Sequence, residues 1–440
     1  MRSLSKALPN NGWEVSILSG SLPGGPGDAE TFYSGLDIHA VDFTAGEAPM
    51  HPSYEDRPGA PDRCFALVDD DAYHRHVAAW ERALNEIGAQ SFDVLLLNHL
   101  TPLNQAAARV APEVPIVGHL HGTELMMLER IDEGPPAHWT HAAAWARRMR
   151  RWARQCTRIV VQTPRNVDRA VALLGVEPGA CVVVANGFDP ASFAPRPIDR
   201  AEFWRRALVE QPQGWRPGAE PGSVAYQPEQ VEVLNDAVVL VAVGRYTAVK
   251  RLSLLIEAFA RAERRVPQAP ALVIVGGFPG EWETEHPWDA VERTGARNVF
   301  LAGWHEHSAL PSFLNATDAQ VLASVREQFG LVLVEGMACG LPAIAVDCLG
   351  PAEIVEHGRT GWLVDPDDVD ALTDAIIAVL SDDPERLRRG LAARATAIAR
   401  WGWPALAGRI ARVLDEAEEE PMVEPRASWL QPRASSGSTR

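Results

Sequence analysis

The sequence has few cysteines, no long apolar run and no excess of positive charge, and each absence excludes a class of protein. The five cysteines include no C-x-x-C pair, which excludes a disulfide framework and a zinc site and is typical of reduced cytosolic thiols. Without a run of about 18 apolar residues we expect no membrane-spanning helix. A net charge of −17 excludes sequence-independent binding of nucleic acid. The start of the chain lacks the apolar region of a signal peptide, so we predict a cytoplasmic protein.

Short apolar segments alternate with helix-length segments along the 440 residues, which is typical of parallel α/β sheets. A chain of this length fits two domains of about 200 residues each. The strands expected in the first half are 14–19, 93–98, 115–119, 159–163 and 181–185. The second half restarts with strands expected at 238–244, 271–277, 299–303, 319–324 and 343–347, which are continuously apolar, as strands covered on both faces should be.

The composition along the chain suggests where the domains end. Residues 191–236 are rich in Pro, Gly and charge, so we interpret them as a linker or surface insertion. This divides the chain into an N-terminal domain at 1–190 and a C-terminal domain at 237–400. Residues 401–418 are expected to form a helix that crosses back to the N-terminal domain, and 419–440, without periodicity, a disordered tail.

The first residues are unusual for a nucleotide-binding α/β domain, which normally opens with a strand and a glycine-rich turn. Here "RSLSKAL" reads as the first helix and "WEVSIL" as the next strand. The opening strand and its glycine turn are therefore expected to be missing. Either the domain has a shorter design or, as we expect, the natural chain begins further upstream.

Two glutamates flank an apolar run in "REQFGLVLVEGMACGLP" (326–342). On one helix, Glu327 and Glu335 would lie about 12 Å apart along the axis and could not share one small group. We therefore predict a loop that carries Glu327 and a helix that begins near Gly330 and carries Glu335, at the carboxyl end of strand 319–324. Ligands of open α/β sheets bind at such ends, and a helix N-terminus suits a phosphate. The alternative is a solvent-facing Glu327 and a capping Glu335.

Three further stretches carry candidate chemistry. Arg245 and Lys250 follow strand 238–244, where two cations can clamp a diphosphate. In "HLHGTE" (119–124), His121 is the functional candidate; a metal held by His119 and His121 is the weaker alternative, because no third ligand is evident. The helix in "HAAAWARRMRRWARQC" (141–156) is basic and amphipathic. It either packs its apolar stripe on the sheet, which we expect, or makes a peripheral membrane contact.

Together these stretches resemble the retaining nucleotide-sugar glycosyltransferases of family 4, which have the GT-B fold of two Rossmann-like domains facing each other across a cleft. The resemblance lies in residues 326–368, 244–251, 185–193 and 119–124. It implies that Arg245 and Lys250 bind the diphosphate of the donor and stabilise the leaving nucleotide. It also implies front-face transfer, in which the leaving phosphate takes the proton of the acceptor, without a metal or other cofactor.

The resemblance also assigns the rest of the donor. Glu327 would hold the transferred sugar, and Glu335 the ribose. His121 would contact the sugar from the N-terminal domain, and the base would lie near Gly303 and Trp304. The backbone that joins Glu327 in holding the sugar is that of Phe329, Gly330 and Leu331.

The function expected is therefore transfer of a sugar from a UDP-, GDP- or ADP-sugar to an unidentified acceptor such as a lipid, a polyol, a small phosphate ester or a polysaccharide. Two alternatives stay open. A nucleotide-sugar epimerase with the same fold would interconvert sugars without an acceptor. A non-catalytic nucleotide-sugar-binding protein would bind the nucleotide without turnover, and the missing opening strand makes this alternative relevant.

Overall fold

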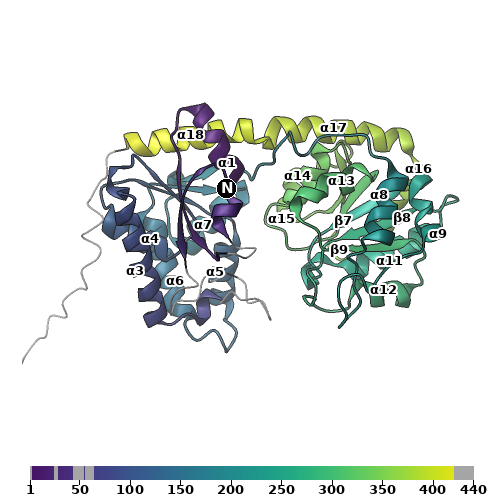
Figure 1. Cartoon of the computed structure of the whole chain (residues 1–440), viewed down its shortest axis with the longest axis horizontal. Coiled ribbons are helices and arrows are strands. Elements are labelled where there is room, and N and C mark those ends of the chain that lie inside the picture. The colour runs from purple at the N-terminus through teal and green to yellow at the C-terminus, as the bar shows by residue number, and fades with distance from the viewer. Residues whose placement is uncertain (1, 24–27, 43–53, 55–63, 421–440) are drawn as a thin grey trace, which may run out of the picture. The chain divides into compact units, whose positions relative to one another are not determined.

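The computed structural model of the chain describes residues 2–23, 28–42, 54 and 64–420. The chain divides into two compact units, which are described separately (Figure 1). Unit 1 comprises residues 1–185 and 406–440, and unit 2 comprises residues 186–405. The disordered tail expected at 419–440 lies outside the described residues from residue 421 onward.

Unit 2 is built on a parallel sheet of six strands in the order β12-β11-β10-β7-β8-β9. The chain forms β7 first, adds β8 and β9 on one side, and then crosses to β10, β11 and β12 on the other. The order therefore reverses between β7 and β10, and ligands of such sheets bind at the carboxyl ends of the strands at this point. The strands are β7 (Val239–Val243), β8 (Ala271–Val275), β9 (Val299–Gly303), β10 (Ala319–Leu322), β11 (Ala343–Val346) and β12 (Gly361–Val364).

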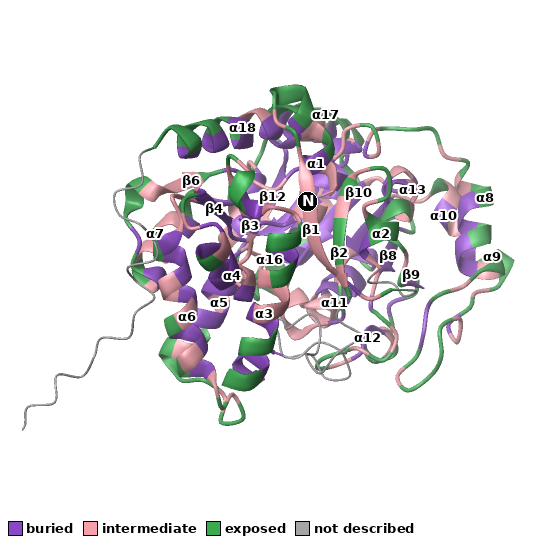
Figure 2. Ribbon diagram, turned by 60° about the vertical axis from the view of Figure 1, so that its left-hand side comes forward, coloured by how far each residue is buried: buried purple, intermediate pink, exposed green. Residues whose placement is uncertain are grey.

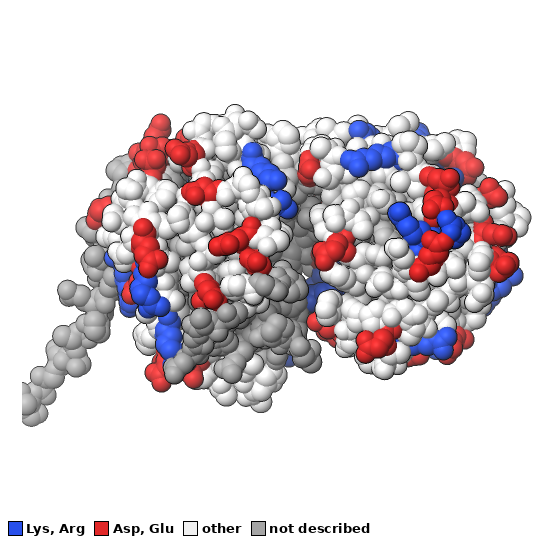
Figure 3. Space-filling model, viewed as in Figure 1, with Lys and Arg blue, Asp and Glu red and all other residues white. Residues whose placement is uncertain are grey.

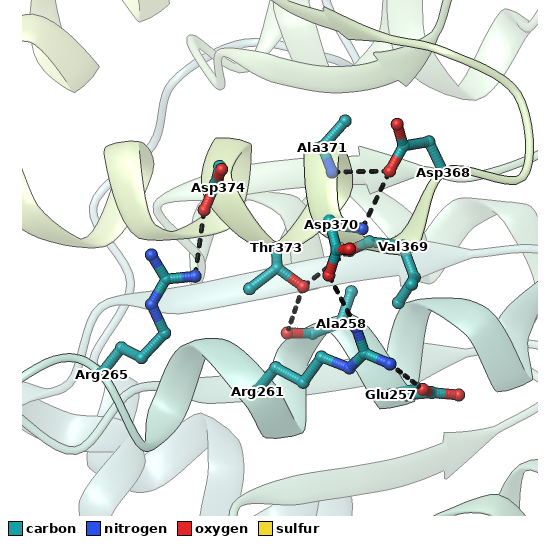
Figure 4. A network of polar contacts seen from close by, with 10 residues as sticks. All are labelled: Glu257, Ala258, Arg261, Arg265, Asp368, Val369, Asp370, Ala371, Thr373 and Asp374. Carbon is teal, nitrogen blue, oxygen red and sulfur yellow. Dashed lines mark hydrogen bonds and ion pairs between the residues drawn. The ribbon is translucent and has the colours of Figure 1, made fainter.

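Helices cover both faces of this sheet, which explains why its strands are continuously apolar. All residues of β8 and β9 are buried. On one face α11 packs against α16, where the Thr373 hydroxyl donates to the carbonyl of Ala258 at 3.4 Å (Figure 4). The helices of unit 2 include α11 (Leu252–Glu263), α12 (Pro287–Thr294), α13 (Leu310–Asn315), α14 (Leu331–Ala338), α15 (Leu349–Ile354), α16 (Val369–Ser381) and α17 (Asp383–Trp401).

The N-terminus of α16 is capped by Asp368, whose carboxylate accepts hydrogen bonds from the backbone N–H groups of Asp370 at 3.0 Å and Ala371 at 2.9 Å (Figure 4). Replacing an N-cap residue with alanine costs about 1 kcal/mol. We expect Asp368→Ala to lower the free energy of unfolding by about that amount. Asp370→Ala is the matched control: its side chain is 84% exposed, so its effect should stay within about 0.5 kcal/mol. Urea unfolding of both variants checks this, and equal effects would contradict the capping role.

The Pro- and Gly-rich segment 191–236 lies within unit 2. It contains α8 (Arg200–Trp204), a π-helical turn (Arg205–Glu210), α9 (Pro228–Val231) and α10 (Val233–Asp236). Trp204 and Trp215 are fully buried, and the indole N–H of Trp215 donates to the carbonyl of Gly277 at 3.0 Å. Gln213 forms a parallel bridge to Gly303 at the end of β9. Of the two interpretations of this segment, the buried tryptophans favour a packed insertion over a linker.

Unit 1 contains two separate parallel sheets. One has the order β3-β4-β5-β6, and the other pairs β1 with β2. Within the described residues no strand joins β1 to β3, so the two sheets are separate. The strands are β1 (Ser16–Ser21), β2 (Asp37–Asp42), β3 (Leu95–Asn98), β4 (Ile116–His119), β5 (Arg158–Val161) and β6 (Cys181–Val183). The helices are α1 (Arg2–Ala7), α2 (Ala29–Phe32), α3 (Asp70–Glu86), α4 (Pro102–Val110), α5 (Thr123–Glu133), α6 (Ala142–Gln155), α7 (Pro164–Leu174) and, from Leu406, most of α18 (Trp403–Glu419).

The basic helix α6 packs its apolar stripe into the core of unit 1, as expected. Trp145, Met149 and Trp152 are buried, and arginines between them pair with acidic residues, as Arg150 does with Asp132 at 2.7 Å. Helix α18 has the same amphipathic pattern, with buried and exposed residues alternating along it (Figure 2). On the face in Figure 3, acidic and basic side chains are interspersed over the described residues. No helix in the described parts of the chain is long and apolar enough to cross a bilayer.

Candidate functional site

Lys250 and Glu327 meet at the point where the strand order of unit 2 reverses. Lys250 ends the short 3-10 turn η6 (Ala248–Lys250) after β7, and Glu327 lies in the loop after β10. The lysine Nζ is 2.5 Å from the glutamate Oε2, and the two side chains are only 17% and 23% exposed. Because both are largely shielded from water, their attraction is stronger than that of a surface pair. The structure therefore brings together these two residues, which the sequence predicted on separate loops of one site.

The loops that carry this pair are fixed by backbone contacts. The N–H of Val325 donates to the carbonyl of Val249 at 3.0 Å, which joins the loop after β10 to the loop after β7. The N–H of Gly350 donates to the carbonyl of Glu327, also at 3.0 Å. The side chain of Lys250 lies against Gly244, where a Cβ would come within 3.3 Å of the lysine Cε. Glycine at this position leaves room for the lysine to cross the end of β7.

Helix α14 begins where the sequence predicts. Gly330 is its N-cap with φ of 93°, a left-handed conformation that glycine adopts without strain. Leu331 is the first helical residue, and Gly340 follows the helix with φ of 91°. Phe329 is buried before the cap. Glu327 and Glu335 therefore lie on a loop and a helix, as predicted, and the first N–H groups of α14 lie next to the Glu327 loop.

Glu335 is buried and has a partner that the sequence did not reveal. Its Oε1 is 2.7 Å from Nε2 of His307, and its side chain is 4% exposed while that of His307 is 65% exposed. The hydrogen bond that His307 donates to the Glu335 carboxylate raises the pKa of His307, against the opposing effect of burial. The signal in the sequence was weak, because His307 lies 28 residues from Glu335 in a segment with no motif.

The raised pKa of His307 gives a pH dependence with a definite sign. Its folded-state pKa exceeds the unfolded value, so the stabilisation is fully present below the unfolded pKa and is lost as pH rises through the folded pKa. We expect the thermal midpoint of the wild type to be higher than that of His307→Gln. The difference should be largest near pH 5.5 and should shrink progressively toward pH 8.5. Midpoints of both proteins across this range check it. A difference that grows with pH would contradict the pairing.

Three exposed side chains surround the same end of the sheet. Arg245 follows β7, Phe278 follows β8, and Trp304 follows β9. The Phe278 and Trp304 side chains are 49% and 40% exposed, and their rings meet edge to face with centroids 5.8 Å apart. An exposed aromatic pair offers a face on which a planar ring can stack. Trp304 was expected to lie near a base; Phe278 was not predicted.

His121 lies in unit 1, just after β4, so the structure places it in a different unit from the other predicted site residues. Its Nε2 is 3.1 Å from Oδ1 of Asn98, and its backbone N–H donates to Glu124 at 3.2 Å. Burial, followed by the nearby histidines His119 and His99, holds the pKa of His121 well below its usual value. This shift favours the neutral imidazole of His121. No group of three or more His, Cys, Asp or Glu side chains in the described parts of the chain is arranged to hold a metal ion.

Solved structures of known proteins share this fold. The chain aligns with the Anabaena protein Alr3699/HepE in complex with UDP and glucose at a TM-score of 0.65 and 19% identity, covering 94% of this chain and 95% of that one. Sucrose-phosphate synthase from Thermosynechococcus elongatus gives a TM-score of 0.65 at 18% identity, covering 94% and 92%. The two units with parallel Rossmann-like sheets define a protein of the GT-B fold class.

Family comparison gives the identity within that class. The model for glycosyltransferase family 4 matches residues 1–192, and the model for group 1 glycosyl transferases matches residues 226–396. The chain therefore belongs to the glycosyltransferases of family 4 and group 1. The second match contains Lys250, Glu327 and Glu335, and the first contains His121.

Curated relatives are similar over part of their length. D-inositol 3-phosphate glycosyltransferase 2 of Catenulispora acidiphila is 29% identical over 269 residues, 60% of this chain and 57% of that protein. The GDP-mannose-dependent alpha-(1-6)-phosphatidylinositol monomannoside mannosyltransferase of Mycolicibacterium smegmatis is 32% identical over 192 residues, 42% of this chain and 50% of that protein. The chain thus spans about half the length of the curated relatives it matches.

Proposed function

We propose that this protein transfers a sugar from a nucleoside-diphosphate sugar to a hydroxyl group of an acceptor. The observation that carries the proposal is the Lys250–Glu327 pair, 2.5 Å apart, at the switch point of a six-stranded Rossmann-like sheet in a chain of this family. A shielded lysine there suits a diphosphate, and a glutamate beside it suits the hydroxyls of a sugar. The UDP bound in the Anabaena neighbour makes UDP-sugars one candidate donor class, and the name of the mannosyltransferase relative adds GDP-sugars.

Each predicted residue has a role in this proposal. Arg245 and Lys250 bind the diphosphate, supported by the N–H groups of Phe329, Gly330 and Leu331 at the start of α14. Glu327 holds the transferred sugar. Glu335 holds the ribose after exchanging its bond to His307 for the ribose hydroxyls. Trp304, beside Phe278, contacts the base, and His121 contributes a neutral imidazole that contacts the sugar.

The proposed reaction retains the anomeric configuration and uses no metal. The bond between the anomeric carbon and the donor phosphate breaks, and the acceptor oxygen bonds to the same face of that carbon. The acceptor proton passes to the leaving phosphate oxygen. Negative charge develops on the nucleoside diphosphate, so cations and backbone N–H groups already in place stabilise the transition state. No carboxylate nucleophile is needed in such a reaction.

The test is acceptor-dependent release of nucleoside diphosphate. The chain is incubated with UDP-, GDP- and ADP-sugars, alone and with a panel of polyols, phosphate esters and oligosaccharides. We expect one donor to release its nucleoside diphosphate and form a glycoside only when an acceptor is present. Interconversion of sugars from the donor alone would instead identify an epimerase. Tight nucleotide binding without turnover on any acceptor would identify a non-catalytic binding protein.

A further inference from the structure

A fully buried carboxylate lies behind the polar cluster at the carboxyl end of the unit 1 sheet. Glu124, in the first turn of α5, has no exposed surface. Its Oε1 is 2.5 Å from Nδ1 of His99, and its Oε2 accepts from the backbone N–H of His121 at 3.2 Å and from the Thr123 hydroxyl at 3.4 Å. Burial of a lone carboxylate is costly, so these contacts explain how a charged Glu124 is tolerated there.

His99 is the outward member of this pair. It directly follows β3, with φ of 63°, a left-handed conformation uncommon for a residue other than glycine. Its side chain is 36% exposed, which shows that the ring extends from the buried carboxylate toward the surface. Its Nδ1 is hydrogen-bonded to Glu124, and no hydrogen bond to Nε2 occurs among the described residues. Among the described residues, Nε2 is therefore the His99 nitrogen left for a ligand.

The histidines of this cluster have pKa values shifted in opposite directions. The rings of His99 and His121 are 4.6 Å apart between centroids, as are those of His121 and His119, and Tyr54 lies 5.6 Å from His99 on another side. Burial lowers the pKa of His99, but the charge and hydrogen bond of Glu124 outweigh it and raise that pKa overall. Burial lowers the pKa of His119 to about 3. Titratable groups whose pKa values are pushed apart suit different roles, and His99 is the histidine whose protonated form Glu124 favours.

We propose that His99, oriented by Glu124, binds an oxyanion of the acceptor, a phosphate or a carboxylate group. The inference rests on the proposed transferase function and adds the chemical class of the acceptor. A protonated imidazole whose Nδ1–H is held by a carboxylate presents its Nε2–H in a fixed direction, and hydrogen bonds from a cation to an oxyanion are about twice as strong as neutral ones. Helices α4 and α5 begin just beyond β3 and β4, so their positive dipole ends add to the attraction.

The probe for this site is inorganic sulfate, which stays dianionic across the pH range of the experiment. Imidazole nitrogen NMR spectra of the full chain are recorded with increasing sulfate between pH 5.5 and 8.5. We expect sulfate to shift the His99 resonances and raise the pKa of His99, with an affinity that falls about tenfold for each pH unit above that pKa. The exposed His138 and His357 should not respond. Unshifted His99 resonances at pH 5.5, or binding that strengthens as pH rises, would overturn the proposal.

Variants separate this site from the donor site. His99→Asn keeps a residue that tolerates positive φ and should abolish the sulfate response, whereas Lys250→Ala in unit 2 should keep it. Glu124→Gln should weaken sulfate binding at pH 7; if that variant does not fold, His99→Asn alone decides. An equal sulfate response at the remaining histidines of His99→Asn would show an adventitious ion only. Nucleotide binding by His99→Asn should stay unchanged. A protein that binds no nucleotide would therefore contradict the proposed donor site without deciding whether His99 binds an oxyanion.

A second arm identifies the source of the oxyanion. Glycerol 3-phosphate represents a soluble phosphate ester, and vesicles containing phosphatidylglycerol represent a membrane-bound one. A response of His99 to either supports the proposal and assigns the acceptor to that source. If the His99 resonances respond to neither probe at concentrations where sulfate binds, the oxyanion site does not belong to an acceptor, and the proposal is overturned.

Discussion

Lys250→Ala and Glu327→Ala should each lower kcat for sugar transfer by about 100-fold or more, while leaving the fold intact. Removing one group that stabilises developing charge typically costs about 100- to 1,000-fold. In each variant one charge at the switch point loses its partner at 2.5 Å. Steady-state kinetics with the donor identified in the turnover screen measures the effect.

The double variant tests whether the two residues act as a unit. Residues in direct contact show non-additive effects, so Lys250→Ala/Glu327→Ala should lose about as much activity as the more severe single variant. Arg261→Ala is the matched control, because Arg261 forms a comparable ion pair with Glu257 at 2.5 Å in the same unit, on α11 away from the switch point (Figure 4). Unchanged kcat in either single variant would remove the pair from the catalytic machinery.

Gly303→Ala should be strongly destabilising. Gly303 ends β9 with φ of 75°, and a Cβ there would lie 2.0 Å from the backbone carbonyl oxygen of Gln213. A left-handed residue other than glycine costs about 1–2 kcal/mol, and forcing an extra carbon into a packed interior costs about 1–3 kcal/mol. Together they predict a loss of about 3 kcal/mol and a thermal midpoint lower by about 6–12 °C for a unit of this size. Calorimetry or circular dichroism melts measure it.

Gly295→Ala separates the two causes. Gly295 ends α12 with φ of 66°, but a Cβ there would have only an ordinary contact, 3.9 Å from Arg264. Gly295→Ala should therefore lower the free energy of unfolding only by the cost of the left-handed backbone conformation, about 1 kcal/mol. If both variants lose the same amount, the packing of the 191–236 insertion against β9 contributes nothing. In that case Trp304, the next residue, is not positioned by it.

Much of unit 2 could be predicted from the sequence, because its strands are buried on both faces and therefore read as continuous apolar runs. The prediction failed to find β12, and in unit 1 it missed β2. Strand β2 (Asp37–Asp42) is largely exposed and carries two aspartates and a histidine, so it has no apolar run by which a buried strand could be predicted. The insertion was predicted from its Pro, Gly and charge content, which does not reveal that Trp204 and Trp215 are buried.

Site residues that directly follow strands could be predicted from the sequence. Their hydrogen-bond partners could not where these lie far away in the sequence. Lys250 and Glu327 lie at the ends of adjacent strands, β7 and β10, and topology brings such ends together. The partner of Glu335 could not be predicted in this way. His307 lies in a short 3-10 turn after β9, and it contacts Glu335 from 28 residues away in the sequence. His99 could have been found, since it follows an expected strand just as His121 does, but its significance depends on Glu124, whose burial is a tertiary property.

The most direct test of the account is calorimetric titration of the wild type and Lys250→Ala with UDP, GDP and ADP, with thermal midpoints recorded in parallel. We predict that one nucleoside diphosphate binds the wild type and raises its midpoint by about 5–10 °C at roughly 100 times Kd. Lys250→Ala should bind it at least about tenfold more weakly. If none of the three binds the wild type, the switch point of unit 2 is not a nucleotide site, and the proposed transfer reaction is contradicted.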